Sequence, residues 1–291
     1  MTIPRGAVRG VVLASAVIGV AALLAALSCE VEHGIAPLPG MVRARVLFYG
    51  GPPPKNTQGI YLVVAPKFPP RAINELYHSP NSLPFKWDAV RDTVMAEMGL
   101  PYGHYEAISL WWYNTETKSN LADVLALPLD ATNNLLPLGF DITKEEPVFE
   151  IDLRANWSRV DRDASIEGTL YFNGPFPGNT LATAVAAYVR KPEVNVEYLT
   201  LLKSIDFSVG PESEKFDAQK NAYHYVLPVR HGTVEYVAVF WLPERASLTD
   251  YRVLGIYEDP SAPGEPGKLS IKAGETKKGV DIFVDWAKAK P

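Results

Sequence analysis

The sequence predicts an all-β fold of two duplicated sandwich domains with a short helical insertion, and two observations lead to this prediction. The first is an alternation of apolar and polar residues over short runs. In residues 280–286, for example, Val280, Ile282, Val284 and Trp286 share one face of the predicted strand. A period of two, rich in β-branched and aromatic residues, is typical of strands that bury one face. The second observation is a long internal repeat.

The repeat is found when the chain is compared with itself at an offset of 129 residues. Residues 103–157 then superpose on residues 232–286 without a gap, with eleven identical positions. Average residue usage predicts about three or four identities. The identical pairs are Gly103/Gly232, Glu106/Glu235, Trp112/Trp241, Val124/Val253, Leu125/Leu254, Asp130/Asp259, Pro137/Pro266, Ile142/Ile271, Glu146/Glu275, Asp152/Asp281 and Trp157/Trp286.

Upstream, the repeat continues at a smaller offset. Residues 46–50 match residues 170–174 at an offset of 124, so the second copy is longer by five residues in between. A period this long indicates duplicated domains rather than a solenoid of short repeats. We therefore expect two sandwich domains, at residues 41–160 and 165–291.

The other predicted strands are short, and proline- and glycine-rich breaks separate them. They are residues 43–49, 60–65, 105–113, 122–127, 151–157, 167–173, 183–189, 223–229, 234–241 and 251–257.

Three segments depart from this alternation and are predicted to be helical. Residues 87–99 place Trp87 and Met98 near one helical face and end on a glycine, which predicts a short helix. Residues 72–77 and 195–203 are expected to form single helical turns. Insertions of this kind, near one end of a sandwich, are where recognition often resides.

The first residues have the order of a secretory signal. Arg5 and Arg9 precede an uninterrupted apolar run, and Ser28 then precedes Cys29, the single cysteine of the chain. The motif Ala26-Leu27-Ser28-Cys29 resembles the lipobox of bacterial lipoproteins, which implies cleavage after residue 28 and lipidation of Cys29. Two alternatives remain: the run of about 18 residues is an uncleaved membrane anchor, or Cys29 is an ordinary buried thiol.

A lipidated Cys29 implies a location at the cell envelope. Two or three acyl chains hold a protein on a membrane essentially permanently, and residues 29–40 would form a flexible tether. In some bacteria, an aspartate directly after the lipidated cysteine resembles an inner-membrane retention signal. Glu30 stands at that position in this chain, so the outer membrane is favoured. The expected partners are the membrane, through the lipid, and a protein or glycan.

Composition excludes several functional classes. The formal charge is −5, and it becomes −7 once Arg5 and Arg9 are removed, so there is no basic footprint for nucleic acid. Known nucleophile, phosphate-loop and metal-ligand motifs are absent from the sequence. No histidine is retained between the two copies, so we expect no catalytic residue, no metal and no cofactor. The acidic loop 257–265 offers carboxylate oxygens of the kind that calcium prefers. The alternative is that these carboxylates only keep the loop soluble.

Two segments carry a resemblance to a known family. Residues 268–284, two predicted strands around an Ala-Gly-Glu-Thr turn, resemble the last hairpin of carboxypeptidase-regulatory-like domains, and residues 168–177 are similar to their first strand. The resemblance implies transthyretin-like or immunoglobulin-like sandwiches. In that family the domains are non-catalytic and act as spacers, adhesion units or supports.

Aromatic residues give the candidate ligand-binding site. Trp111 and Trp112 lie on a strand equivalent to that of Trp241, and alternation points successive rings to opposite faces. An exposed tryptophan would stack on sugars or anchor a protein contact. The alternative is that both faces of these strands are covered.

These observations predict a non-enzymatic, membrane-anchored envelope lipoprotein that acts as a structural or binding module. The alternative is a carbohydrate-binding or glycan-processing accessory lipoprotein, whose mark would be a groove lined by tryptophan and the insertion helix. A third interpretation is a hydrolase with an unfamiliar site, which requires carboxylates or histidines converging in one pocket.

Overall fold

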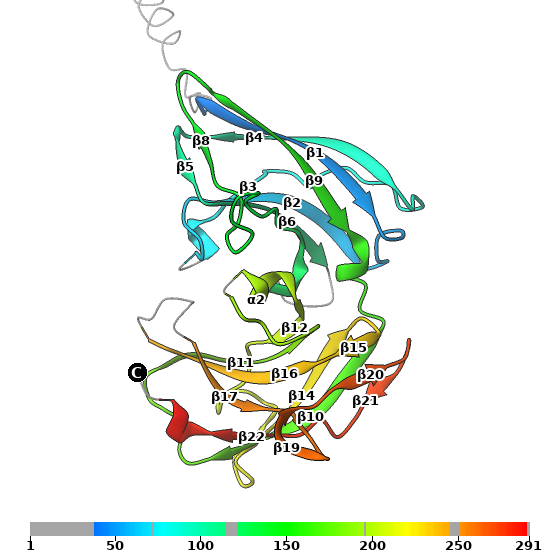
Figure 1. Ribbon diagram of the computed structural model, residues 1–291, viewed down its shortest axis with the longest axis vertical. Coiled ribbons are helices and arrows are strands. Elements are labelled where there is room, and N and C mark those ends of the chain that lie inside the picture. Colours follow the sequence, from blue (N-terminus) through cyan, green and yellow to red (C-terminus); the bar gives the residue numbers. More distant parts are fainter. Residues whose placement is uncertain (1–37, 71–72, 115–120, 195, 245–250, 290–291) are drawn as a thin grey trace, which may run out of the picture. The chain divides into compact units, whose positions relative to one another are not determined.

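The computed structural model describes residues 38–70, 73–114, 121–194, 196–244 and 251–289 (Figure 1). The signal segment 1–28, Cys29 and most of the predicted tether lie outside these residues. Residues 39–291 belong to one compact unit. Among the described residues, no helix is both long and apolar enough to cross a membrane.

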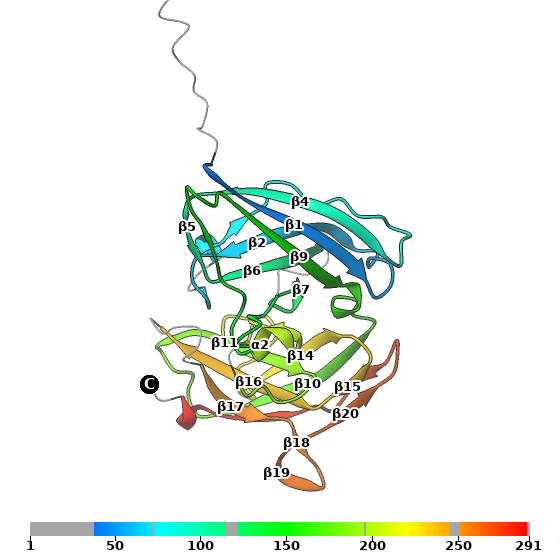
Figure 2. The same ribbon diagram turned by 45° about the horizontal axis from the view of Figure 1, so that its top comes forward.

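The first group of strands forms two facing sheets and a small pair. One sheet has the order β4-β1-β9 and the other β3-β2-β6-β7, while β5 pairs with β8 (Figures 1 and 2). The strands are β1 (Gly40–Tyr49), β2 (Thr57–Ala65), β3 (Tyr77–His78), β4 (Asp92–Leu100), β5 (Gly103–Tyr105), β6 (Ala107–Asn114), β7 (Val124–Ala126), β8 (Phe140–Ile142) and β9 (Val148–Asn156).

The second group repeats this plan with additional short strands. One sheet has the order β13-β14-β10-β21, with β22 also on β10, and the other has the order β12-β11-β16-β17. The strands are β10 (Ala164–Asn173), β11 (Thr180–Tyr188), β12 (Leu202–Asp206), β13 (Phe216–Asp217), β14 (Ala222–Val229), β15 (Gly232–Val234), β16 (Tyr236–Pro243), β17 (Arg252–Ile256), β18 (Glu258–Asp259), β19 (Ala262–Pro266), β20 (Leu269–Ile271), β21 (Thr276–Lys277) and β22 (Ile282–Asp285).

Helical structure is limited to short pieces: η1 (Ile73–Glu75), η2 (Leu121–Asp123), η3 (Trp157–Arg159), α2 (Glu197–Thr200) and η4 (Trp286–Lys288). Of the three predicted helical segments, those at 72–77 and 195–203 contain η1 and α2. The predicted all-β fold of two immunoglobulin-like or transthyretin-like sandwiches with a short helical insertion is therefore confirmed. The bounds assigned to the two domains stay a prediction.

Each sandwich has its own buried core between its two sheets. Val42, Val46, Ile60 and Leu110 contribute to the first core, and all four are fully buried. The second core is built from equivalent strands and contains the fully buried Trp241. The inward residues of β1 and β10 alternate with partly exposed ones, as the sequence pattern predicts.

The strand pairings of the two sandwiches share one register. In the first, Phe48 lies opposite Ala155 in the parallel pair β1–β9. In the second, Phe172 lies opposite Val284 in the parallel pair β10–β22. Both pairs are related by the sequence offsets of 124 and 129. The bulge in β6–β7 between Leu110 and Trp111 also recurs in β16–β17, 129 residues later.

The helix predicted at residues 87–99 is wrong, because residues 92–100 form strand β4. Nine residues of β4 pair antiparallel with β1. Ala96, Met98 and Leu100 point into the core at every second position, while Glu97 between them is exposed. Methionine, alanine and glutamate favour helices, but a cross-strand partner and a core face override such local preferences.

The hairpin predicted at residues 268–284 is also wrong. Strand β20 pairs antiparallel with β15, whereas β21 and β22 run parallel to β10. The turn between β20 and β21 is present, with Gly274 at φ +74°. The two strands therefore leave this turn for different sheets instead of pairing with each other.

Candidate functional site

Of the predicted ligand-binding tryptophans, two are core residues. Trp112 is 3% exposed and Trp241 is fully buried. Trp111, on the opposite face of β6, is half-buried. Because the rings of Trp112 and Trp241 are covered, they offer no face on which a sugar ring could stack.

The equivalent faces of the second sandwich are covered as well. Phe240, the neighbour of Trp241, is buried in a second apolar cluster with Tyr188 and Tyr236. Tyr198 of α2 and Ala122 of η2 pack into the same cluster. Both faces of β16 are therefore covered.

A hydrogen bond fixes each buried indole to a nearby loop. The Nε1 atom of Trp112 donates to Oγ1 of Thr57 at 2.8 Å, and that hydroxyl donates to the carbonyl oxygen of Pro54 at 2.7 Å. This chain of bonds holds the proline loop 50–56 against the end of β6. The buried indole N–H group is therefore satisfied, as a buried donor requires.

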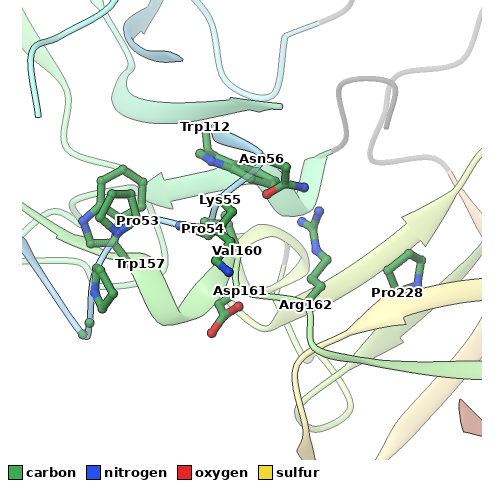
Figure 3. A pocket seen from close by; sticks show the side chains of 13 residues that line it. Pro53, Pro54, Lys55, Asn56, Trp112, Trp157, Val160, Asp161, Arg162 and Pro228 are labelled. Carbon is green, nitrogen blue, oxygen red and sulfur yellow. The ribbon is translucent and has the colours of Figure 1, made fainter. Parts of the chain in front are cut away.

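The proline loop forms one wall of a pocket of about 560 Å³ (Figure 3). The loop supplies residues 50–56, the end of β6 supplies Trp112, and the segment after β9 supplies Trp157 and residues 160–162. Pro228 of β14 completes the lining. Its volume lies within the range of small-molecule sites.

Local contacts keep these walls in place. Trp157 stacks on Phe48 at 5.0 Å between ring centroids and meets the edge of Phe85 at 5.8 Å. Asn156 begins η3 with its side chain accepting a hydrogen bond from Ser158 N at 3.0 Å. Gly50 has φ +89°, and a Cβ atom there would lie 2.0 Å from Asn156 Oδ1, so only glycine fits.

Arg162 is the buried charge at this pocket. Its side chain is 8% exposed and pairs with Asp123, which is 1% exposed, through an Nη2–Oδ1 contact of 2.8 Å. Its guanidinium carbon lies 5.7 Å from the ring centroid of Trp112. The Nε atom is buried and has no hydrogen-bond partner among the described residues.

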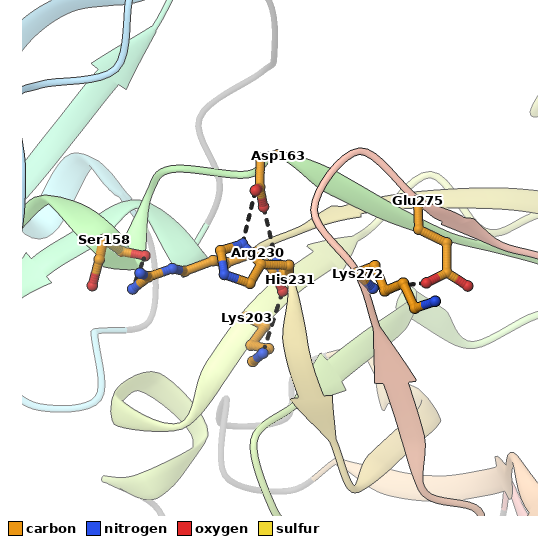
Figure 4. A network of polar contacts seen from close by, with 7 residues as sticks. All are labelled: Ser158, Asp163, Lys203, Arg230, His231, Lys272 and Glu275. Atoms are coloured by element: carbon orange, nitrogen blue, oxygen red, sulfur yellow. Dashed lines mark hydrogen bonds and ion pairs between the residues drawn. The ribbon is translucent and has the colours of Figure 1, made fainter.

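A second polar network lies where the chain passes from η3 to β10 (Figure 4). The carboxylate of Asp163 accepts from the backbone N of His231 at 2.9 Å, and its second oxygen lies 2.8 Å from His231 Nδ1. Arg230 donates to the carbonyl oxygen of Ser158 at 3.4 Å, and Lys203 donates to the carbonyl oxygen of Arg230 at 3.4 Å. These bonds tie the connecting segment to the turn between β14 and β15.

The same network shifts the pKa of two groups. Burial raises the pKa of Asp163, but hydrogen bonds from His231 outweigh burial, so the pKa of Asp163 lies below its ordinary value. Burial, together with the charge of Arg230, lowers the pKa of Lys203. Both pKa shifts therefore follow from the contacts that tie the segment after η3 to the turn between β14 and β15.

The carboxylates retained between the two copies also have structural partners. Asp152 accepts two hydrogen bonds from Arg45 of the neighbouring strand, and the equivalent Asp281 accepts from Thr169 N at 2.8 Å. Glu275 accepts from Lys272 N at 2.7 Å and so closes a turn. Among the described residues, no three acidic, histidine or cysteine side chains are grouped as metal ligands would be.

The proposed calcium loop is likewise closed by its own hydrogen bonds. Asp259 Oδ1 accepts from Ser261 N and Oγ at 2.8 and 2.6 Å. Glu258 accepts from Gly264 N at 3.0 Å. The carboxylates of Glu258 and Asp259 therefore hold the loop in its conformation by hydrogen bonds to its own residues.

Two residues of interest were missed by the sequence analysis. Arg162 lies between the two repeat copies, where no alignment draws attention to it. Trp87, placed in the wrong helix, lies in a loop and is 54% exposed, with its ring against the edge of Phe85 at 4.9 Å. The ring is exposed because residue 87 lies in a loop, and the helix predicted at residues 87–99 gave no indication of this exposure.

The chain matches no protein-family model and no curated protein. Among solved structures, a leucine-rich repeat protein from Bacteroides thetaiotaomicron aligns over 84% of this chain at 10% identity and a TM-score of 0.32. The alignment covers 26% of that protein, so the chain spans about a quarter of its length.

Two further solved structures cover more of their own chains. A candidate adhesin from Bacteroides ovatus aligns over 84% of this chain and 93% of its own, at 10% identity and a TM-score of 0.25. The streptococcal ancillary pilin aligns over 84% and 62%, at 10% identity and a TM-score of 0.20. TM-scores this low do not establish a shared fold, so the fold of this chain is assigned from the strand pairings described above.

Proposed function

We propose that this chain is a non-enzymatic envelope lipoprotein, anchored through Cys29, that acts as a structural or binding module. The observation that carries the binding role is the pocket beside the proline loop, with its buried and incompletely paired Arg162. The anchor rests on the order of basic head, apolar run, Ser28 and Cys29 in the sequence.

The roles of the titratable side chains support a non-enzymatic module. Asp152, Asp163 and Glu275 each engage a neighbouring strand or turn. A catalytic site requires such groups to converge on a reacting atom. In this chain they stabilise the connections between strands instead.

Membrane fractionation of cells that produce wild type or Cys29→Ala tests the anchor. Lipidation predicts that wild type stays with the membrane and that Cys29→Ala is released. Ser28→Ala is the matched control, because alanine before the cysteine keeps the lipobox pattern. A Cys29→Ala variant that has lost residues 1–28 and still stays bound to the membrane would exclude the lipid anchor.

Protease treatment of intact cells then distinguishes the two sides of the outer membrane. Degradation of wild type in intact cells would indicate display on the surface, where external glycans or partner cells are accessible. Protection would indicate a periplasmic location and a role in envelope assembly.

A glycan-binding accessory remains the second candidate, and Trp87 is the observation that favours it. The ring of Trp87 is exposed, unlike those of Trp112 and Trp241. Stacking on a sugar predicts that Trp87→Ala abolishes retention on a glycan array while Tyr113→Ala, an exposed aromatic change on β6, leaves it intact. Equal retention of Trp87→Ala and wild type would exclude this role.

A further inference from the structure

We infer that the outer face of the second sandwich binds an arginine side chain of a protein partner. Tyr171 and Phe283 form the platform on which the guanidinium lies, and Asp281 and Asp285 accept its hydrogen bonds. This inference goes beyond the function proposed above, because it concerns a different surface and depends neither on the anchor nor on the pocket beside the proline loop.

An exposed aromatic pair marks this face. Phe283 of β22 is 77% exposed, and Tyr171 of β10 is 38% exposed. The two residues lie opposite each other in the parallel pair β10–β22 (Figure 1), and their rings stack at 5.4 Å between centroids. Among the described strands, β22 pairs only with β10, so Phe283 stands at the edge of its sheet. Aromatic side chains are enriched where proteins contact each other.

The fold does not require aromatic rings at these positions. In the first sandwich, Leu47 and Arg154 occupy the equivalent positions at the offsets of 124 and 129, and they also lie opposite each other. Leu47 is half-buried and Arg154 is exposed. The same sheet face therefore forms with an aliphatic and a charged residue, which indicates that the aromatic pair has a role of its own in the second copy.

Two carboxylates flank the ring of Phe283. Asp281 and Asp285 lie two residues before and after it, so they share its side of the strand, each roughly 7 Å away along the chain. Asp281 Oδ1 accepts from Thr169 N at 2.8 Å, and Asp285 Oδ1 accepts from Ala287 N at 3.0 Å. Among the described residues, neither carboxylate forms an ion pair, so the second oxygen of each is available to a donor.

The first sandwich shows which group is missing beside Asp281. The equivalent residue, Asp152, accepts two hydrogen bonds from the guanidinium of Arg45 on the neighbouring strand. Thr169 occupies the place of Arg45 in the second sandwich. The carboxylate is thus retained while its arginine is not, and an arginine from a partner restores the pair. A guanidinium binds a carboxylate with two donors and also stacks on an aromatic ring, whereas a lysine ammonium is a point charge.

The charges around the platform favour a cation. Glu167, on the same face of β10 as Tyr171, pairs at 3.7 Å with both His224 and Lys278, so these two basic groups are already engaged. The end of the face that carries Phe283 therefore has unpaired negative charge. Such charge attracts a cationic partner and repels an anionic one.

The probe is the peptide acetyl-Gly-Arg-Gly-amide, and its control is the same peptide with citrulline, whose urea group has nearly the same shape without the charge. The full chain in detergent micelles is titrated with each peptide, and the ring resonances of Tyr171 and Phe283 are followed by NMR. A saturable shift with the arginine peptide is expected, and the citrulline peptide should bind about tenfold more weakly. Unmoved ring resonances, or equal binding of the two peptides, overturn the inference. Because binding is measured on purified protein, the result is independent of the Cys29→Ala fractionation.

A neutral sugar tests the competing occupant. A glycan would also use exposed aromatic rings, but it carries no cation for the two carboxylates. Methyl β-glucoside is therefore titrated in the same way and is expected to leave both ring resonances unmoved. A glucoside that binds at these rings as tightly as the arginine peptide would assign the face to a glycan and overturn the inference.

One variant tests the platform. Phe283→Ala removes the stacking surface and should weaken binding of the arginine peptide by about threefold. Because the ring is 77% exposed, the variant is expected to fold. Leu47→Ala, at the position equivalent to Tyr171 in the first sandwich, is the matched control and should bind like wild type. Wild-type affinity in Phe283→Ala overturns the inference.

A double variant tests the charges. Asp281→Asn with Asp285→Asn removes both charges but keeps an acceptor oxygen for each backbone N–H, and asparagine begins a helical turn as well as aspartate does. Binding of the arginine peptide should weaken by about tenfold. Glu212→Gln with Glu214→Gln removes the same charge from two exposed residues in the loop before β13 and should bind like wild type. Equal affinities of the two double variants would also overturn the inference.

Discussion

The buried indole of Trp112 donates a hydrogen bond from Nε1 to Oγ1 of Thr57, at 2.8 Å between the two atoms. Trp241 makes the same bond to Thr180, also at 2.8 Å. In both copies the threonine hydroxyl then donates to the carbonyl oxygen of a proline, Pro54 or Pro177, at 2.7 Å. A tryptophan retained at the repeat offset therefore keeps its partner as well as its place in the core.

Replacing either threonine with valine should destabilise the fold. Thr57→Val and Thr180→Val keep the shape of the side chain but leave a buried indole N–H unpaired. The expected loss is about 1–3 kcal/mol in the free energy of unfolding. Urea denaturation measures it, with Thr233→Val, an exposed change on β15, as the control. Two variants as stable as wild type would show that the bond contributes nothing.

Gly168 is required for a close approach between β10 and the segment that joins β21 to β22. A Cβ atom at this position would lie 2.0 Å from the carbonyl oxygen of Val280, which also accepts the hydroxyl of Tyr225 at 2.5 Å. We expect Gly168→Ala to cost about 1–3 kcal/mol through overpacking. Gly178→Ala, with open space around its Cβ, should be neutral or stabilising by up to about 1 kcal/mol. Thermal unfolding of the two variants checks the contrast, and equal melting temperatures would contradict it.

The buried pair of Arg162 and Asp123 should show strong coupling. Asp123→Ala leaves the Arg162 charge buried without its counter-ion, and a loss of about 3–5 kcal/mol is expected. The double variant Asp123→Ala with Arg162→Met removes both charges and should lose less than Asp123→Ala alone. A double-mutant cycle by chemical denaturation measures the coupling. Additive losses would mean that the two charges do not stabilise each other.

Asp163 should make the fold sensitive to acid. Its pKa in the folded protein lies below the ordinary value of 3.8, because hydrogen bonds from His231 outweigh the effect of burial. A lowered folded pKa contributes stability above the unfolded pKa, and this contribution is lost as the pH falls through the folded pKa. Asp163→Asn should therefore be less stable than wild type at neutral pH.

At low pH, the free energies of unfolding of wild type and Asp163→Asn should approach each other. The stability gap between wild type and Asp163→Asn should narrow below about pH 4. Urea denaturation at several pH values from neutral to acid measures the gap. A gap that stays constant over this range would show that the ionised carboxylate of Asp163 does not stabilise the fold.

Much of the fold could be predicted because alternation and repetition are local and visible in a sequence. The runs that became β1, β10 and β14 alternate with a period of two, whereas β16 is a continuous apolar run that is buried on both faces. Strand β4 was missed because Met95, Ala96, Glu97 and Met98 favour a helix by themselves. Its equivalent, β14, was predicted correctly, and the offset of 129 places Val94 at Tyr223. Extending the repeat upstream of residue 103 would have corrected the error.

The candidate site was harder to predict, because its parts come together only through tertiary contacts. The proline loop looked like a break between strands, and alternation alone did not show which of Trp111 and Trp112 faces the core. Arg162 sits in the connection between the copies, and its importance depends on Asp123, 39 residues earlier. No spacing rule links an arginine in a connecting segment to an aspartate in a short helical turn.

The parallel pairing of first and last strands has a mechanical consequence. β1 and β9 run side by side in the same direction over nine residue pairs, so the start of one and the end of the other lie at opposite ends of the sheet. Tension applied through the chain would load these hydrogen bonds in shear, and they would have to rupture together rather than unzip singly. The second sandwich has a shorter clamp, because its parallel contact with β10 is interrupted between Lys277 and Ile282. Under load, it should yield before the first.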